Sequence, residues 1–320
     1  MEERLKTYIK NCSPSAFGEA SFDEIEIKKL AAGCYNVNYL VRINSKKYVF
    51  RLNIHSDECE GGNLGREYAV LKYLNGLYSP DVILFDNSFD YPLLVEQFCE
   101  GNKITELNKQ IMQKIAFALG AIHKQSSPIK EKQGKNLKDF YTSIFESRRP
   151  TLEKNSTMKN ELSDFIKKAE NYVIDKNSKF AELILQGLLH GDMHCDNILI
   201  SDSNIVFVDW ENTKMGDPVF DIVAFFYESE NLQYFDKSRS LTPELKEFFI
   251  DEYLNVNPDR HLREKLEIIY PLRWLEDTLW LASRIINYED IPKESRDKPL
   301  DRYKELYRFN LYKLHKLWKN

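Results

Sequence analysis

One short segment gathers polar residues of a kind that could do chemistry together. In "GLLHGDMHCDNILISDSNIVFVDWEN", which begins at Gly187, Asp192 precedes Asn197 by five residues, and Asn197 leads directly into the apolar run "ILI". A second apolar run, "IVFV", ends at Asp209. Polar side chains beside buried strands need partners, which come either from one another or from a bound group. A site is therefore the favoured interpretation, and simple capping of loop backbone is the alternative.

The spacing of the three side chains suits phosphoryl transfer. The turn "SDSN" joins the two apolar runs into a hairpin, which brings Asn197 and Asp209 side by side at one end. One carboxylate and one amide oxygen suit Mg²⁺, which completes its shell with phosphate oxygens and water. Asp192 is set back from this pair, where it can accept a proton from an attacking hydroxyl. The segment predicts Asp192 as the base and Asn197 and Asp209 as metal ligands.

The elements that precede this segment read mainly as strands. The runs "NVNYLVRI" and "YVFRLN", separated by the polar turn "NSKK", predict a hairpin. A helix follows in "GREYAVLKYLNGL", where apolar residues recur at helical spacing. Two further strands are expected in "DVILFD" and "YPLLVEQF". Residues 1–98 are therefore predicted to form a small antiparallel sheet lobe with one helix.

The rest of the chain reads mainly as helices. "ITELNKQIMQKIAFALGAIHKQ", "PLRWLEDTLWLASRIINY" and "LDRYKELYRFNLYKLHKLW" keep the 3.6-residue apolar period of packed helices. The Lys-, Asn- and Ser-rich stretch 125–162 shows weak periodicity and is expected to be a solvated loop with one short helix. The prediction is an α+β protein whose second lobe, residues 99–320, is larger, helical, and carries the catalytic and acceptor-binding groups.

Taken together, these motifs resemble the aminoglycoside phosphotransferase and choline kinase branch of the protein-kinase-like superfamily. In that branch "HGD" stands where protein kinases have "HRD", and "DWE" stands where they have "DFG"; the resemblance covers most of residues 25–225. It implies a two-lobed kinase-like fold and an ATP- and Mg²⁺-dependent small-molecule kinase. It also implies that Asp192 is the base, that Asn197 and Asp209 hold Mg²⁺, that His190 supports the loop, and that Asp221 caps its backbone.

The same resemblance assigns nucleotide-binding roles in the first lobe. Gly33, in "LAAGCYNVNYLV", would let backbone approach the phosphates, although a single glycine is often only a turn. Arg51 stands where kinases place a phosphate-binding lysine, with Glu67 as its expected ion-pair partner; arginine differs from lysine in reach and shape. The backbone of Glu96 and Phe98 would face adenine.

Four other interpretations remain open at this stage. His190, Asp192, His194 and Cys195 could bind zinc, although no second ligand pair stands at a recognisable spacing. Arg51 and Glu67 could be an ordinary surface ion pair. A protein kinase needs a long peptide-docking segment, whereas only "WENTKMGDPVF" separates Asp209 from Asp221. A catalytically silent nucleotide-binding scaffold would fit Arg51 and the sparse glycines.

Composition narrows the class of partner. The net charge of −5 and the dispersed basic residues argue against nucleic acid. Five scattered cysteines without a CxxC pair favour reduced thiols, and no export signal or membrane-length apolar run stands out, so a cytoplasmic protein without membrane contact is expected. The sequence does not indicate the oligomeric state or a preference between ATP and GTP.

The acceptor is predicted to be a small hydroxyl compound with at most one or two positive charges. Trp274 and Trp280 share a helix with Glu276 and Asp277, and an aromatic face beside a carboxylate attracts a cation. The alternative is that both tryptophans are core. Residues 293–320 hold nine Lys and Arg against four Asp and Glu, which would repel a polycationic aminoglycoside.

Overall fold

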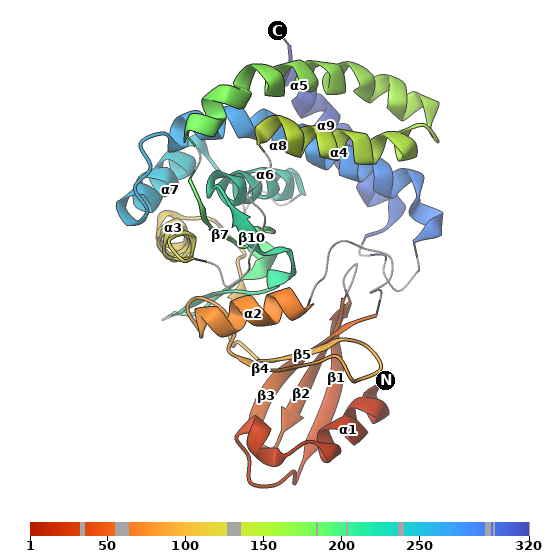
Figure 1. Ribbon diagram of the computed structural model, residues 1–320, viewed down its shortest axis with the longest axis vertical. Coiled ribbons are helices and arrows are strands. Elements are labelled where there is room, and N and C mark those ends of the chain that lie inside the picture. The colour runs from red at the N-terminus through yellow and green to blue at the C-terminus, as the bar shows by residue number, and fades with distance from the viewer. Residues whose placement is uncertain are drawn as a thin grey trace.

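The first part of the chain is an antiparallel five-stranded sheet, as the sequence predicts. The computed structural model describes residues 1–32, 36–54, 64–126, 136–183, 185–202, 204–235, 240–291, 296 and 298–319. The sheet order is β1-β2-β3-β5-β4 (Figure 1), with bounds β1 Ile25–Ala32, β2 Asn36–Ile43, β3 Lys46–Asn53, β4 Val82–Asp86 and β5 Leu93–Gln97. The expected hairpin is β2 with β3, which turns at Asn44, where φ is +52°.

The two faces of this sheet are covered by different helices. Helix α1 (Glu2–Asn11) and the short η1 (Pro14–Phe17) bury Leu5, Ile9 and Phe17 with one set of strand side chains, which includes Phe50 and Val95. Helix α2 (Leu64–Leu74) packs on the opposite side, where its apolar residues cluster with Leu94. Because strand side chains alternate between faces, Arg51 and Glu96 point to the α2 side.

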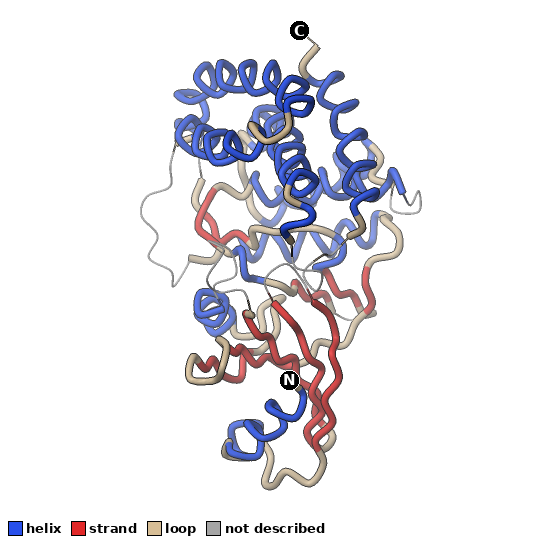
Figure 2. The backbone as a smooth tube through the Cα atoms, turned by 90° about the vertical axis from the view of Figure 1, so that its right-hand side faces the viewer, coloured by secondary structure: helices blue, strands red, loops and turns tan. Residues whose placement is uncertain are grey.

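The second part is mainly helical, as the sequence predicts. The helices are α3 Lys109–His123, α4 Leu137–Leu152, α5 Ser156–Leu183, α6 Val219–Phe235, α7 Pro243–Val256, α8 Leu262–Ile286 and α9 Leu300–Leu317. Short strands lie between them and the sheet lobe: β6 Asn102–Lys103, β7 Gly187–Leu189, β8 Ile198–Ile200, β9 Ile205–Phe207 and β10 Lys214–Gly216. Helices α4, α5, α8 and α9 and the large sheet occupy opposite ends of the molecule (Figure 1 and Figure 2).

The prediction of a mostly solvated stretch at 125–162 is wrong for the residues described there. Helix α4 fills residues 137–152, and α5 begins at Ser156. The Asn136 side chain accepts a hydrogen bond from the Asp139 amide at 2.9 Å and so caps α4. Leu137, Tyr141 and Phe145 recur every four residues and form the buried stripe. The surrounding polar residues masked this period in the sequence.

The larger hydrophobic cluster extends from the helical part into α2. Leu64, Val70, Leu71 and Leu74 belong to the same cluster as the cores of α3, α6 and α8. The α+β two-lobed fold is therefore confirmed, whereas the exact boundary between residues 98 and 99 stays a prediction. In the described part of the chain, no helix combines the length and the apolar character that a membrane crossing requires.

Candidate active site

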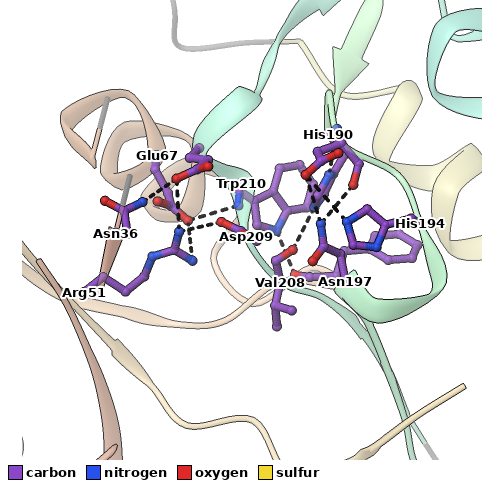
Figure 3. Close-up of polar contacts among 12 residues, drawn as sticks. Asn36, Arg51, Glu67, His190, His194, Asn197, Val208, Asp209 and Trp210 are labelled. Atoms are coloured by element: carbon purple, nitrogen blue, oxygen red, sulfur yellow. Dashed lines mark hydrogen bonds and ion pairs between the residues drawn. The ribbon is translucent and has the colours of Figure 1, made fainter. Parts of the chain in front are cut away.

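Asp192 lies in the loop that connects β7 to β8. Its side chain is 40% exposed, so it can reach a bound molecule. The Asn197 side chain donates its Nδ2 hydrogens to the Asp192 carbonyl oxygen at 3.0 Å and to Oδ2 at 3.4 Å (Figure 3). The two residues are thus brought together across the short helix η2 (Cys195–Asn197), as their spacing predicts. Because Nδ2 is occupied, Oδ1 is the atom that Asn197 can offer to a cation.

Asp221 fixes the start of this loop. From the first turn of α6 its carboxylate accepts hydrogen bonds from the amides of His190 at 2.7 Å and Gly191 at 2.9 Å. His123 on α3 lies against the same carboxylate at 3.1 Å. Burial alone would raise the pKa of Asp221, but these partners outweigh it and lower the pKa, so the group stays ionised. The expected capping role of Asp221 is confirmed.

A second buried carboxylate, Asp217, anchors the segment that follows β9 and Asp209. Asp217 accepts hydrogen bonds from the Leu185 amide at 2.7 Å and the Val219 amide at 2.9 Å. Lys265 on α8 reaches it at 2.7 Å and pairs with Asp259 at 2.6 Å, and the Lys265 side chain is fully buried. A charge this deep is tolerated only because it is paired on two sides.

Gly191 is required by geometry rather than by flexibility. Its φ is +85°, and a Cβ at this position would lie 2.1 Å from the carbonyl oxygen of Asn212. Any side chain would therefore push the loop away from residues 210–212. The "HGD" glycine lets the catalytic loop pack directly on the turn that follows Asp209.

His190 supports the loop from inside, as expected. Its Nε2 is 3.0 Å from the carbonyl oxygen of Val208, while its Nδ1 accepts the Asp192 amide at 3.3 Å. The ring packs at 4.7 Å, centroid to centroid, on the ring of Trp210. Burial lowers the pKa of His190, which keeps the ring neutral with the proton on Nε2. It therefore links the catalytic loop to the strand that leads to Asp209.

His194 is a neighbour of Asp192 that the sequence reading did not assign, apart from the zinc alternative. Its Nε2 lies 3.6 Å from Asp192 Oδ2, and its Nδ1 accepts the Asp196 amide at 3.2 Å. Burial would raise the pKa of Asp192, but the hydrogen bond and charge of His194 outweigh it and hold the pKa at about 2. Asp192 is therefore an ionised acceptor for a proton near neutral pH.

The hairpin of β8 and β9 places Asn197 and Asp209 at one end. The Val208 amide donates to the Asn197 carbonyl at 2.9 Å, so Asp209 follows directly on the residue opposite Asn197. Asp209 has a left-handed backbone, with φ +70°, which is uncommon outside glycine and turns its side chain away from the strand. That side chain is 36% exposed.

Arg51 joins the sheet lobe to this end of the hairpin. Its Nη1 lies 3.3 Å from Glu67 Oε1, and its Nη2 lies 2.5 Å from Asp209 Oδ1 and 3.7 Å from Glu211 Oε2 (Figure 3). The side chains of Arg51 and Glu67 are 4% and 0% exposed, so the surface-pair alternative is wrong. The resemblance implies that the Arg51 guanidinium binds nucleotide phosphate. These three carboxylates therefore compete with the phosphate for it.

Glu67 also fixes the backbone after Asp209. Its Oε1 accepts the Trp210 amide at 3.0 Å, which ties helix α2 to the residue directly after Asp209. Two further groups complete the arrangement: Glu211, and Asn36, which donates to Glu211 Oε2. The sequence reading missed both, although Glu211 is the third letter of "DWE". Its position two residues after Asp209 was the available signal.

The remaining nucleotide residues are only partly addressed by the structure. Gly33 lies outside the described residues. The Phe98 amide donates to the Lys47 carbonyl at 3.1 Å and is thereby occupied within the sheet. Glu96 opposes Val49 in the β3–β5 pairing, and its side chain is buried. Contact of the Glu96 and Phe98 backbone with adenine stays a prediction.

The donor set suits a hard divalent cation. Asp209 offers an exposed carboxylate, Asn197 offers Oδ1, and Glu211 lies beside them against Arg51. Mg²⁺ needs few protein oxygens when phosphates are also bound, so these residues fit it. Among the described residues, no group of three His, Cys, Asp or Glu side chains is arranged to hold a metal ion, so the zinc alternative gains no support.

On the acceptor side, the aromatic faces are covered by the chain's own cations. Trp274 is fully buried and Lys313 lies 5.0 Å from its ring, while the Arg284 guanidinium lies 5.6 Å from the ring of Trp280. Arg273 pairs with Asp277 at 2.5 Å and with Glu276 at 3.8 Å. The proposed aromatic cation site on α8 is therefore not formed, and the core interpretation fits Trp274.

Sequence comparison agrees with this geometry. The family model described as "Phosphotransferase enzyme family" matches residues 26–261. The chain belongs to that family. A relative by sequence is the "Protein LicA homolog" of Mycoplasma capricolum, which is 27% identical over 129 residues, or 36% of this chain and 50% of that protein. The chain thus matches about half the length of this curated relative.

Several solved structures share the fold over nearly the whole chain. The choline kinase of Cryptosporidium parvum has a TM-score of 0.71 at 18% identity and is covered over 97% of its length, against all of this chain. The choline kinase LicA of Streptococcus pneumoniae has a TM-score of 0.65 at 22% identity, with 98% of this chain and 99% of that one covered. A LicA complex with AMP has a TM-score of 0.60 at 21% identity, with 97% and 98% covered.

Proposed function

We propose that this phosphotransferase moves the γ-phosphoryl group of ATP, with Mg²⁺, onto a hydroxyl of a small molecule. The observation that carries the proposal is the pairing of an ionised, 40% exposed Asp192 with Asn197 at the end of the hairpin that also presents Asp209. A base and two oxygen ligands are thereby grouped as in-line phosphoryl transfer requires. The AMP bound in a structure of similar fold supports an adenine nucleotide.

Each residue has a distinct part in this reaction. Asp192 accepts the proton of the attacking hydroxyl, and Asn197 holds the Asp192 carboxylate in place through Nδ2. Asp209 and Asn197, with Glu211 beside them, would hold Mg²⁺. The ion supplies neutralisation of charge on the phosphates. Arg51, anchored by Glu67, faces the same region from the sheet.

The structure favours a small acceptor over a peptide. The short segment between Asp209 and Asp221 is used up by η3 (Trp210–Asn212) and by β10, which pairs with β7. Near its start, Asn212 lies directly against Gly191 of the catalytic loop, and near its end Asp217 accepts the Leu185 amide. No part of this segment extends outward as a peptide platform, so a protein kinase function is not proposed.

The acceptor class we propose is a hydroxyl compound with one ammonium group. Glu228 on α6 adjoins Ser229, whose Oγ lies 3.8 Å from Cys195 Sγ in the catalytic loop. Burial raises the pKa of Glu228, and the charges of His194, Arg273 and Asp192 act on it, so this carboxyl belongs to the charged surroundings of the catalytic loop. Choline kinases of similar fold make amino alcohols the first compounds to test.

The test is phosphate transfer from ATP to a panel of alcohols. Purified protein with Mg²⁺ is incubated with choline, ethanolamine, sugars and an aminoglycoside, and the phosphorylated product is measured by mass spectrometry. We expect product with an amino alcohol and none with Asp192→Asn. Nucleotide binding without product from any acceptor would favour the silent scaffold instead.

A further inference from the structure

Four carboxylates surround a single guanidinium on the nucleotide side of the site. Arg51 contacts Glu67, Asp209 and Glu211, and the charge of Glu96 acts on it as well. Arg51 is the cation shared by all four. When all four are ionised, Arg51 can balance the charge of only one of them.

Glu96 is the member of this group that the proposed reaction does not use through its side chain. In the β3–β5 pairing Glu96 opposes Val49, and Arg51 opposes Leu94. Val49 and Arg51 are two residues apart, so Glu96 and Arg51 are diagonal neighbours on one face of the sheet. This face is the one that α2 covers, and Glu67 reaches Arg51 from α2.

The Glu96 carboxylate is buried and incompletely satisfied. The residue is 4% exposed, and its Oε2 has no hydrogen-bond partner among the described residues. Glu67 Oε2 and Arg51 Nε are in the same state. Such atoms are rare in folded proteins because each costs free energy when it is removed from water. Burial, opposed by Arg51 and increased by Glu67, raises the pKa of Glu96 to about 8.

We propose that Glu96 is a specificity-determining residue that makes the nucleotide site select metal-complexed over metal-free nucleotide. The inference rests on the proposed function. Above about pH 8, where it is ionised, Glu96 offsets part of the attraction between Arg51 and the phosphates, so a nucleotide without its cation is held less tightly. A divalent cation brings the missing positive charge to the same region. Without the Glu96 charge, Arg51 would attract phosphate by itself.

Calorimetric titration with ADP tests this directly. Wild type, Glu96→Gln and Glu96→Leu are compared at pH 9, where the carboxylate is ionised, once with EDTA and once with excess Mg²⁺. We expect metal-free ADP to bind about tenfold more tightly to both variants. The affinity for Mg·ADP changes by a smaller factor, so the ratio of the two dissociation constants falls. The control Glu26→Gln removes an exposed charge from the same sheet and leaves the ratio unchanged.

The sign of the effect separates this role from a structural one. Damage to the sheet would weaken ADP binding in both conditions, whereas loss of repulsion strengthens the metal-free case. Leucine is included because an apolar residue of similar volume often replaces a buried charge without loss of stability, which circular dichroism verifies. An unchanged or higher ratio in a folded variant would overturn the inference and leave the kinase assignment intact. Wild type that fails to bind Mg·ADP would instead overturn the proposed function and this inference with it.

Discussion

The two sides of Asp192 differ in how their charges are balanced. On the nucleotide side, Arg51 serves four carboxylates, and two of them keep an oxygen without a partner among the described residues. On the acceptor side, Arg273 pairs with Asp277 and Glu276, and its guanidinium lies 5.5 Å from the ring of Tyr227. The first side is built to receive cations. The acceptor side already contains the chain's own cations, so we expect its selectivity for acceptors to depend on packing as much as on charge.

The largest expected effect lies between the two sides. Asp192→Asn should lower turnover by about 10³-fold, because the variant keeps its shape and loses the proton acceptor, while ADP affinity changes little. Steady-state kinetics and calorimetry measure the two quantities. Asp196→Asn, in the same loop and with a 42% exposed side chain, is the matched control. Turnover close to wild type in Asp192→Asn would remove it as the base.

The next largest effect is expected when a proposed Mg²⁺ ligand on the nucleotide side is removed. Asp209→Ala should abolish the gain in ADP affinity that Mg²⁺ provides, and Asn197→Ala should reduce it, because both oxygens hold the ion. Titration of ADP with and without Mg²⁺ gives this gain directly. Asp202→Ala, at the exposed opposite end of the hairpin, should keep it. An unchanged gain in both site variants would place the ion elsewhere.

Arg51 should show an intermediate effect. Arg51→Ala removes the shared cation and should raise the KM for ATP or lower kcat by about tenfold, whereas Arg51→Lys should retain more activity because it keeps the charge. Lysine cannot span Glu67 and Asp209 as the two guanidinium nitrogens do. Initial rates over a range of ATP concentrations separate KM from kcat, with the exposed Arg42→Ala as control. Wild-type kinetics in the alanine variant would contradict the role.

A smaller effect is expected in the pH dependence of stability. Glu96 keeps its proton up to about pH 8 when folded, but loses it near its ordinary pKa when unfolded. Between these values the folded state binds more protons, so a rise in pH favours unfolding. Glu96→Gln removes this contribution. The Tm of the variant relative to wild type should therefore increase as the pH rises from about 5 to about 8. A Tm difference that is constant over this range would argue against a buried, titrating Glu96.

The smallest effect concerns the acceptor side. Arg273→Gln uncovers the ring of Tyr227 and leaves Asp277 without its cation. Acceptors with a quaternary ammonium should then gain about threefold in kcat/KM relative to those with a primary amine. Competition between choline and ethanolamine measures this ratio in one reaction. Arg263→Gln, on an exposed part of the same helix, should leave it unchanged. A shift toward the primary amine would contradict the idea that Arg273 fills the cation position.

The difference between the sides also explains what the sequence could predict. Asp192, Asn197 and Asp209 sit at fixed offsets along two adjoining strands, so local geometry alone brings them together. The pairing of Arg51 with Glu67 was implied by the family resemblance, and the structure brings the two side chains to 3.3 Å. The hairpins and most long helices follow equally from hydrophobic period.

Contacts that depend on tertiary packing were not predictable in this way. The aromatic and acidic residues of α8 are of the types that bind a cation. In the structure, however, Lys313 from α9 lies over the ring of Trp274, and Arg284, one turn further along α8, lies over the ring of Trp280. The stretch that holds α4 was expected to contain only one short helix, because the buried stripe of α4 is diluted by polar neighbours. The sequence predicted a role for the backbone of Glu96 at adenine. The structure draws attention instead to its buried carboxylate. Only the pairing register reveals that it faces Arg51.

The buried ion pair between Lys265 and Asp217 has a consequence for the order in which the enzyme becomes competent. Every motif residue has been added to the chain once residue 221 is made, but the cation that holds Asp217 is added more than forty residues later, on α8. Asp217 in turn fixes the amides of Leu185 and Val219, on either side of the catalytic loop. A nascent chain that ends before α8 therefore contains every motif residue but lacks Lys265, whose ion pair with Asp217 fixes the segments on either side of the catalytic loop. We therefore expect activity only after α8 has been made and has packed against Asp217.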